Sequence, residues 1–315
     1  MKLQTNIPIK LSQNKIDYDS KVFLIGSCFV ENMGHKLKYY KFEQLINPTG
    51  ILFHPSAIAE FIGRIKEQQF YIEEELVYNN ERWHCLGAHS KMSDGNIEVV
   101  LTNLNFQLKR SFTFLQKATH IVITLGTSWA YRYKETGALV ANCHKIPKRD
   151  FDKELTEVDD IHSYLLSIVK HIRDLNADAV VLFTISPVRH LKDGFVENQR
   201  SKAHLITAVH KIIASYDRVE YFPSYEIMID ELRDYRFYDR DLLHPSPLAI
   251  DYIWEKFTDA FLSEEATVLA QKVKNIQQGL AHRPFDENSE SHREFRKKLD
   301  VKISELKKSI PHISF

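Results

Sequence analysis

Short apolar runs and amphipathic stretches alternate along most of this chain. Four mostly apolar runs predict strands at residues 22–25, 121–125, 179–185 and 219–222. The first three are nearly continuous and rich in β-branched residues, which is typical of strands covered on both faces. Apolar residues at helical spacing predict helices at residues 29–39, 56–68, 158–175, 197–216 and 247–262.

This alternation predicts an α/β fold, a mainly parallel sheet with helices on both faces. Residues 71–110 break the pattern, because β-like pieces such as 98–101 alternate there with turn signals such as 93–96. We expect them to form a small antiparallel insertion carried on a main domain of residues 1–284. Residues 285–315 are charged and predict a tail that is an exposed helix or partly disordered.

Composition narrows the class of protein. The chain has 315 residues, 43% of them hydrophobic, with 42 Lys+Arg against 42 Asp+Glu. This balance provides no general field for gathering nucleic acid or an acidic membrane, so neither is expected as a partner. The first residues lack the apolar run of a signal peptide. The apolar runs elsewhere are only as long as a strand, too short to span a bilayer. Three cysteines form no disulfide framework, so we expect a soluble cytoplasmic protein.

Polar residues follow three of the predicted strands. Residues 26–28 follow the first, 126–128 the second and 186–190 the third. In an open parallel sheet, sites form at the carboxyl ends of the strands, so these segments are expected to share one edge.

The first of these segments offers two nucleophiles. Gly26 permits a tight turn into the next helix, whose positive end would favour a thiolate at Cys28 and stabilise an oxyanion nearby. In the simpler interpretation, Cys28 is a small buried residue and Ser27 caps the helix. On this segment alone the simpler interpretation is favoured.

Asp241 and His244 change that balance. Three residues apart on a loop, the carboxylate can fix the imidazole tautomer and stabilise the imidazolium formed in proton transfer. Pro247 opens a helix just beyond, and a His at that positive end stays neutral, as a general base must. The alternative is an Asp that caps a turn and a His packed under the last helix. Together with Ser27 or Cys28, the pair indicates acyl-transfer chemistry.

Acyl transfer also needs oxyanion donors and a substrate cleft. The loss of one donor costs about 3 kcal/mol of transition-state stabilisation. The candidate donors are the backbone N–H at the nucleophile, Gly50 and Ser128, although Gly50 and Asn47 are also ordinary turn residues. Candidate substrate-binding residues, each with an alternative role in ion pairing, turns or buried hydrogen bonds, are Asn47, His84, His144, Arg189 and His190. The Cys and His spacings match no structural zinc site, so no metal or other cofactor is expected.

The segment Gly26-Ser27-Cys28-Phe29 resembles the signature of the GSCFA-domain proteins, with Val30 where the motif has Ala. Other segments resemble that family in the same order, at residues 47–50, 124–127, 141–145, 186–190 and 241–245. The family is similar to the SGNH/GDSL hydrolases. The resemblance implies a flavodoxin-like α/β fold with a Ser nucleophile, Gly and Asn oxyanion donors and an Asp-x-x-His pair.

Carried over by position, the resemblance implies specific roles. Asp241 and His244 match the acid–base pair, and Gly50 matches the glycine donor. Cys28, not Ser27, falls at the nucleophile position, and Ser128 stands where those hydrolases have Asn. A thiolate needs less help than a hydroxyl at neutral pH, which favours Cys28 as the nucleophile.

The expected function is hydrolysis of an O-acyl ester, such as that of an acylated carbohydrate, through an acyl-enzyme intermediate. Its partner would be a small-molecule or carbohydrate ester. An O-acyltransferase is chemically adjacent. The alternative from another class is a catalytically weak carbohydrate- or metabolite-binding module. The replacement of Asn by Ser128 favours that alternative, and the intact Asp241–His244 pair argues against it.

Overall fold

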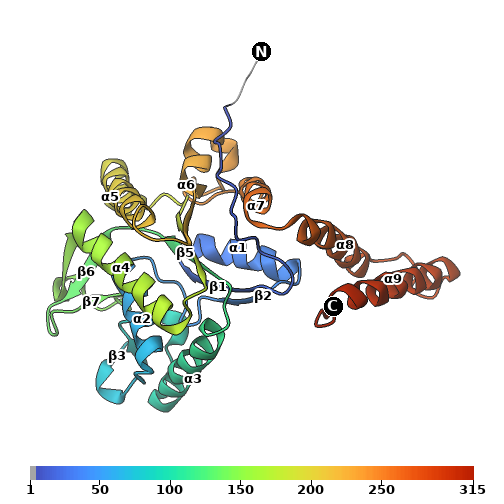
Figure 1. Cartoon of the computed structure of the whole chain (residues 1–315). Helices are drawn as coiled ribbons and strands as arrows, with labels where there is room; N and C mark the ends of the chain where they lie inside the picture. Colours follow the sequence, from blue (N-terminus) through green and yellow to red (C-terminus); the bar gives the residue numbers. More distant parts are fainter. Residues whose placement is uncertain (1–4) are drawn as a thin grey trace.

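A computed structural model describes residues 5–315, so the first four residues of the predicted 1–284 domain lie outside it. The central sheet is parallel throughout, with strand order β10-β9-β5-β1-β2 (Figure 1). Its strands are β1 (Lys21–Gly26), β2 (Glu43–Ile46), β5 (His120–Leu125), β9 (Val180–Ile185) and β10 (Val219–Phe222). The α/β prediction is confirmed.

Helices cover both faces of this sheet, and the last two helices of the chain extend beyond it (Figure 1). Their bounds are α1 (Cys28–Tyr39), α2 (Pro55–Glu67), α3 (Ile97–Leu115), α4 (Val158–Leu175), α5 (Phe195–Ile213), α6 (Ser224–Glu226), α7 (Pro247–Phe261), α8 (Glu264–Ala281) and α9 (Glu290–Ser309). Alternate residues of β1 divide between two cores. Phe23 and Ile25 pack with helices α2 to α5, whereas Val22 and Leu24 pack with α1 and α7. Burial on both faces explains why the central strands β1, β5 and β9 are mostly apolar.

Residues 71–110, predicted to form a small antiparallel insertion, do so only in part. The segment does contain an antiparallel hairpin, β3 (Leu76–Asn79) with β4 (Arg82–Cys85). Residues 98–101, however, are not β-like but belong to α3. That helix buries Val100, Leu104 and Leu108 against the main core, so the four-residue spacing outweighed the local β propensity.

A second antiparallel sheet was not predicted. It has the order β7-β6-β8, with β6 (Trp129–Tyr133), β7 (Leu139–Val140) and β8 (Phe151–Leu155). Only Ala130 of β6 is buried, so the strand carries no apolar alternation that a sequence pattern could detect.

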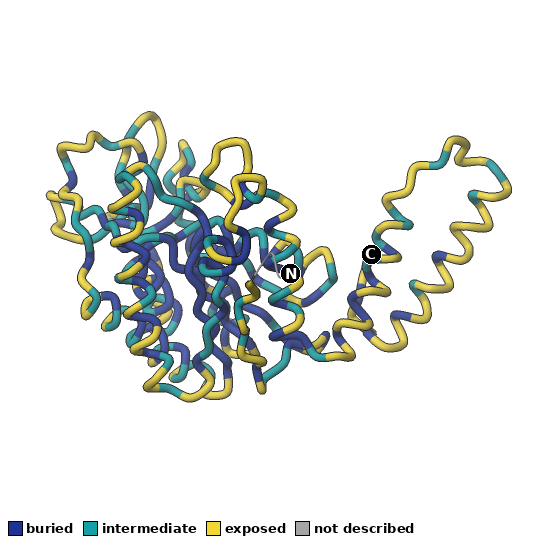
Figure 2. The backbone as a smooth tube through the Cα atoms, turned by 90° about the horizontal axis from the view of Figure 1, so that it is seen from above, coloured by how far each residue is buried: buried dark blue, intermediate teal, exposed yellow. Residues whose placement is uncertain are grey.

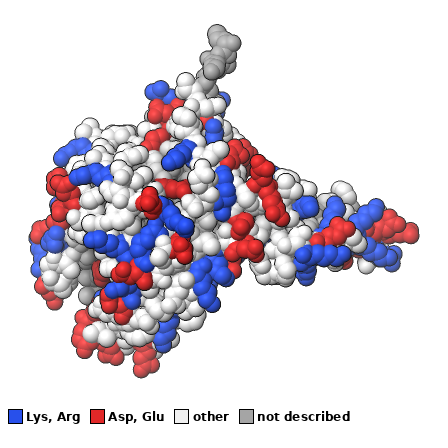
Figure 3. All heavy atoms as spheres, in the orientation of Figure 1, with Lys and Arg blue, Asp and Glu red and all other residues white. Residues whose placement is uncertain are grey.

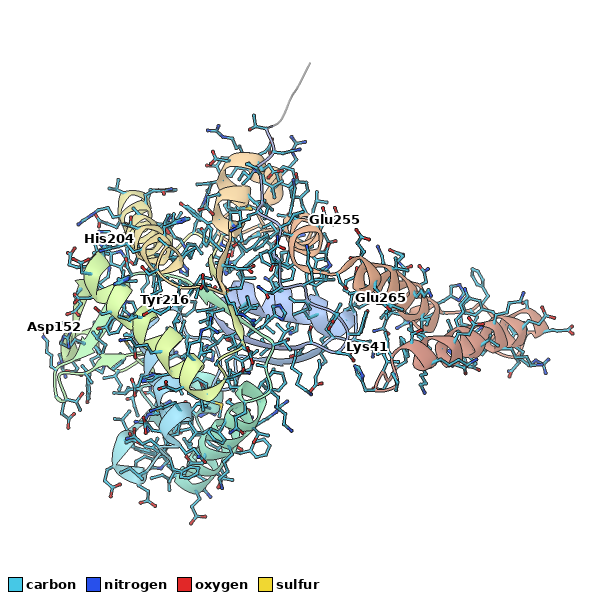
Figure 4. All side chains as sticks on the ribbon, viewed as in Figure 1. Lys41, Asp152, His204, Tyr216, Glu255 and Glu265 are labelled. Atoms are coloured by element: carbon cyan, nitrogen blue, oxygen red, sulfur yellow. The ribbon has the colours of Figure 1, made fainter. Side chains whose placement is uncertain are left out.

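The C-terminal helices α8 and α9 form an arm that projects from the main body, with α9 folding back beside α8 (Figures 1 and 2). Figure 4 labels Glu255 on α7 and Glu265 on α8, where the arm begins. Leu299 and Leu306 are the buried residues of α9. Residues 285–315 thus contain an ordered, largely exposed helix, and their separation from a 1–284 domain stays a prediction.

The surface mixes charges of both signs. On the face drawn in Figure 3, Lys and Arg lie among Asp and Glu over the body and the arm. Along residues 5–315, no helix combines the length and apolar character that crossing a bilayer requires.

Candidate active site

The three polar segments after β1, β5 and β9 meet at one edge of the sheet. In the parallel register, Gly26 pairs with Thr124, and Thr124 pairs with Thr184. The residues that follow each strand are therefore neighbours in space, as sites at the carboxyl ends of parallel strands require.

The turn after β1 depends on Gly26. Its φ is +138°, and a Cβ there would stand 2.1 Å from the carbonyl oxygen of Thr124. The Gly26 N–H donates to the Asn47 Oδ1 at 2.9 Å, and the Ser27 N–H donates to the Thr124 carbonyl at 3.0 Å. Asn47, expected to bind substrate, thus has its side-chain oxygen engaged in holding the turn.

Ser27 and Cys28 have opposite environments. Ser27 is completely buried, its Oγ has no hydrogen-bond partner, and it occupies the N-cap of α1 without a side-chain capping bond. Cys28 is the first residue of α1 and is partly exposed. Burial raises the pKa of its thiol and Glu31 adds to this, while its own backbone N–H, the Phe29 N–H and Lys202 lower it. Of the two candidate nucleophiles, Cys28 is the more accessible.

The structure brings Asp241 and His244 into direct contact. The His244 Nδ1 lies 2.6 Å from the Asp241 Oδ2, and both side chains are close to half exposed. The Asp241 Oδ1 accepts hydrogen bonds from the N–H groups of Leu243 and His244. These backbone bonds, together with the imidazole, hold the pKa of Asp241 down at about 2. The Asp241 carboxylate is therefore ionised near physiological pH.

The loop that carries this pair is tied to the loop after β9. The Arg189 N–H donates to the Leu243 carbonyl at 3.1 Å, which places His190 near the pair. His190 is largely buried and its Nε2 has no partner. Burial, then Lys202 and His244, lower the pKa of His190 to about 3. His190 is thus neutral near physiological pH.

Pairwise electrostatic interactions connect the Cys28 turn with the Asp241–His244 loop. Cys28 interacts with Lys202, Lys202 with His190, and His190 with His244. Over the residues that the structure describes, no hydrogen bond joins the Cys28 thiol directly to the imidazole of His244.

Gly50 and Ser128, the two candidate oxyanion donors outside the nucleophile turn, already donate their hydrogen bonds to other groups. The Gly50 N–H donates to the Asn47 carbonyl at 2.8 Å. Ser128 is fully buried, its N–H donates to the Ser201 Oγ at 2.7 Å, and its hydroxyl donates to the Ser201 carbonyl at 3.2 Å. The N–H groups of Cys28 and Phe29 instead face the Cys28 sulfur at the start of α1, where a developing anion is favoured.

His84 and His144 lie together near the hairpin β3–β4. Their rings stack at 4.6 Å, and both are buried. His84 bonds the Ser93 hydroxyl and the Asn79 carbonyl, and His144 bonds the Cys85 carbonyl. These hydrogen-bond partners lie in or beside the hairpin and are not part of the Cys28–His244 group. Within residues 5–315, no three His, Cys, Asp or Glu side chains are grouped to hold a metal ion.

A pocket of about 380 Å³ adjoins the acid–base loop. Its lining includes Arg189, Gln199, Tyr225, Tyr235 and Tyr238. The Arg189 guanidinium lies 3.9 Å from the ring centroid of Tyr238 and 5.4 Å from that of Tyr235. Since the loop strand at Tyr238 also bridges Pro245, this aromatic wall leads directly to His244.

Lys202 is the site residue that sequence reasoning missed. It is fully buried on α5, and its Nζ donates to the carbonyls of Gly126 at 2.7 Å and Ser186 at 2.8 Å. Burial lowers its pKa to about 7, against the opposing effect of Cys28. The available signal was a lysine on the apolar face of the predicted helix, three residues before Leu205 and seven before Val209.

Solved structures that resemble this chain are carbohydrate esterases of very low identity. A family 3 carbohydrate esterase from Talaromyces cellulolyticus is similar over 81% of this chain and 99% of that chain, at 9% identity and a TM-score of 0.37. The acetyl xylan esterase Est2A from Butyrivibrio proteoclasticus is similar over 78% of this chain and 64% of that chain, at 10% identity and a TM-score of 0.39. The family 3 carbohydrate esterase of Clostridium thermocellum is similar over 84% of this chain and 99% of that chain, at 9% identity and a TM-score of 0.35. No curated protein sequence matches the chain.

Family models describe the chain more directly. The model of the GSCFA family matches residues 21–257, which include the sheet, the Cys28 turn and the Asp241–His244 pair. The model named GSCFA domain protein, C-terminal domain, matches residues 273–315, which include α9. The chain therefore belongs to the GSCFA family.

Proposed function

We propose that this protein hydrolyses O-acyl esters, with Cys28 as nucleophile and His244 as general base. The observation that carries the proposal is the Asp241–His244 hydrogen bond, 2.6 Å long and accessible to solvent, at the sheet edge that also carries a partly exposed Cys28. A base, an acid that orients it and a nucleophile at a helix start are the parts that acyl transfer needs.

The proposed chemistry proceeds in two halves. The Cys28 Sγ attacks the acyl carbon, the thiol proton passes to the His244 Nε2, and the carbonyl electron pair moves onto oxygen. The N–H groups of Cys28 and Phe29 stabilise that oxyanion. When the tetrahedral intermediate collapses, the C–O bond breaks and His244 protonates the leaving alcohol. Water then attacks the thioester, with its proton again taken by His244, which releases the carboxylic acid and the free thiol.

The pocket beside Arg189 is the proposed place for the alcohol portion of the ester. Aromatic faces such as Tyr235 and Tyr238 provide apolar contact for the flat side of a sugar ring. Arg189, which has no ion pair among the residues described, keeps N–H donors for hydroxyl or carboxylate oxygens. An acylated carbohydrate is therefore the proposed substrate class.

Turnover of 4-nitrophenyl acetate and of acetylated sugars by the full chain tests this proposal. His244→Ala should lower kcat/KM at least about 100-fold, because general-base catalysis contributes that much. His312→Ala, at an exposed histidine near the C-terminus, is the matched control and should retain wild-type turnover. Sugar binding with no turnover by the wild-type protein would support a binding module instead. Turnover that survives His244→Ala would contradict the assigned base.

A further inference from the structure

Two arginines line the pocket beside the acid–base loop without an acidic partner. Arg189 lies on the loop after β9, and Arg233 follows the short π-helix Ile227–Glu231. In the part of the chain that the structure describes, no carboxylate forms an ion pair with either guanidinium. By contrast, Arg132 pairs with Glu154 at 2.7 Å. The pocket therefore presents two cations that are free to bind a ligand.

Arg189 is held in place by aromatic rings and by its own backbone. Its guanidinium lies 3.9 Å from the ring centroid of Tyr238 and 5.4 Å from that of Tyr235. Its backbone N–H donates to the Leu243 carbonyl at 3.1 Å. A guanidinium stacked on a ring uses its flat face, so its edge keeps N–H donors for an oxygen anion.

The charges of the pocket lining do not balance. Of the described residues that line the pocket, only Asp234 is acidic. Its carboxylate already binds Arg236, which lies outside the lining, through the guanidinium at 3.2 Å and the backbone N–H at 2.9 Å. Arg189 and Arg233 thus keep their positive charges without a partner. Because a charge beside apolar surface is costly until it is paired, a ligand that supplies negative charge is favoured.

The polar side chains near these arginines also leave donors free. The Gln199 Oε1 accepts a hydrogen bond from the Tyr225 hydroxyl at 2.7 Å, and the Asn198 Oδ1 accepts one from the His190 N–H at 2.9 Å. Each amide therefore has its oxygen occupied and its NH₂ group available to donate. A pocket of about 380 Å³ with such donors is of the size that binds a small molecule, and its polar groups complement ligand oxygens.

We propose that the alcohol portion of the ester substrate carries an anionic oxygen group, a carboxylate or a phosphate, which Arg189 and Arg233 bind in this pocket. This inference rests on the proposed function for the identity of the ligand as a substrate, but the binding itself needs no turnover. The bond from Arg189 to the loop of His244 would place the ester near the base. If both arginines were only solvated surface groups, anionic and neutral sugars would bind alike.

Isothermal titration calorimetry of the full chain tests this with glucuronic acid, glucose 6-phosphate and glucose, which carry a carboxylate, a phosphate and no anion. We expect at least one anionic sugar to bind about tenfold more tightly than glucose, because arginine forms charge-assisted hydrogen bonds with an anion. The tighter of the two identifies the anionic group. Equal affinity for all three sugars, or no binding of either anionic sugar, overturns the proposal.

Arg233→Gln removes one charge at an exposed position and should fold normally. Its affinity for the preferred anionic sugar should fall about tenfold, with no change for glucose. Arg240→Gln is the matched control, because Arg240 is also exposed and without an ion pair among the described residues but lies outside the pocket lining. Unchanged binding in Arg233→Gln, or an equal loss in Arg240→Gln, contradicts the assigned site.

A second variant, Arg189→Gln, keeps the backbone bond to Leu243 and should lose affinity for the anionic sugar to a similar extent. The two proposals fail in different ways. Anion binding that depends on Arg233, without ester turnover, supports the anion site and contradicts the hydrolase. Ester turnover without any preference for anionic sugars overturns this inference and leaves the hydrolase proposal in place.

Discussion

The Asp241 carboxylate binds His244 twice, through the imidazole Nδ1 at 2.6 Å and through the backbone N–H at 3.0 Å. The side-chain bond assigns the proton to Nδ1 and leaves Nε2 to accept one from a nucleophile or water. The backbone bonds, with that to Leu243, shape the loop itself. One carboxylate therefore determines both the tautomer and the orientation of the His244 imidazole.

Asp241→Asn should accordingly reduce kcat at least about 100-fold with little change in KM, because the amide presents a donor where the imidazole needs an acceptor. Circular dichroism should be unchanged, since Asp241 is exposed. Asp239→Asn is the control, a neighbouring exposed carboxylate outside the pair, and should keep wild-type kcat. Full activity of Asp241→Asn would remove the carboxylate from the mechanism.

The unequal burial of Ser27 and Cys28 leads to a second prediction. Cys28→Ser should lower ester turnover by a factor of ten or more, because a serine hydroxyl is mostly un-ionised at neutral pH. Ser27→Ala should retain turnover, since its Oγ is fully buried and without a partner. Steady-state rates and covalent labelling with a thiol-directed probe check both. Equal losses in the two variants would contradict the assignment of the nucleophile to Cys28.

Gly26 should tolerate no side chain. In Gly26→Ala, the new Cβ meets the Thr124 carbonyl at 2.1 Å with a positive φ, so we expect the free energy of unfolding to fall by at least about 3 kcal/mol. The matched control is Gly87→Ala, where a Cβ finds its nearest neighbour at 3.7 Å. Urea denaturation compares the two, and similar midpoints would refute the close approach of β1 and β5 at this turn.

The buried His54 should make the free energy of unfolding depend on pH. Burial lowers its pKa to about 4, so between pH 6.5 and 4 the unfolded chain binds a proton that the folded chain does not. Stability is therefore present above about pH 6.5 and is lost as pH falls. From pH 7 to 4.5, the unfolding free energy should decrease by about 2–3 kcal/mol more in the wild type than in His54→Asn.

Asparagine at position 54 cannot titrate but can still cap α2, as His54 does through the Ser56 N–H. Denaturation midpoints at the two pH values give the comparison. Parallel loss of stability in the two proteins would show that His54 does not contribute to acid sensitivity.

The sequence predicted β1, β5 and β9 because these strands are buried on both faces, so their own residues carry the signal. β2 was missed, since this edge strand has four residues and begins with the polar Glu43 and Gln44. The spacing of Asp241 and His244 was likewise sufficient to predict their local pairing. These features depend on residues near one another in the chain.

The remaining parts of the site depend on distant partners. Ser128 is engaged by Ser201, 73 residues later, and Lys202 is held by carbonyls that any residue would supply. Backbone carbonyls leave no mark in an amino-acid sequence. The pocket wall at Arg189 and Tyr238 also forms only when two loops meet. A sequence pattern contains no information on such encounters.

The hydrogen bond from Arg189 to Leu243 makes the aromatic pocket and the base one mechanical unit. A small molecule bound between Arg189 and Tyr238 would displace the loop that carries the His244 imidazole. It would do so without occupying the space next to the Cys28 sulfur. In the mechanism proposed above, an inhibitor bound in that pocket therefore needs no electrophile that reacts with Cys28.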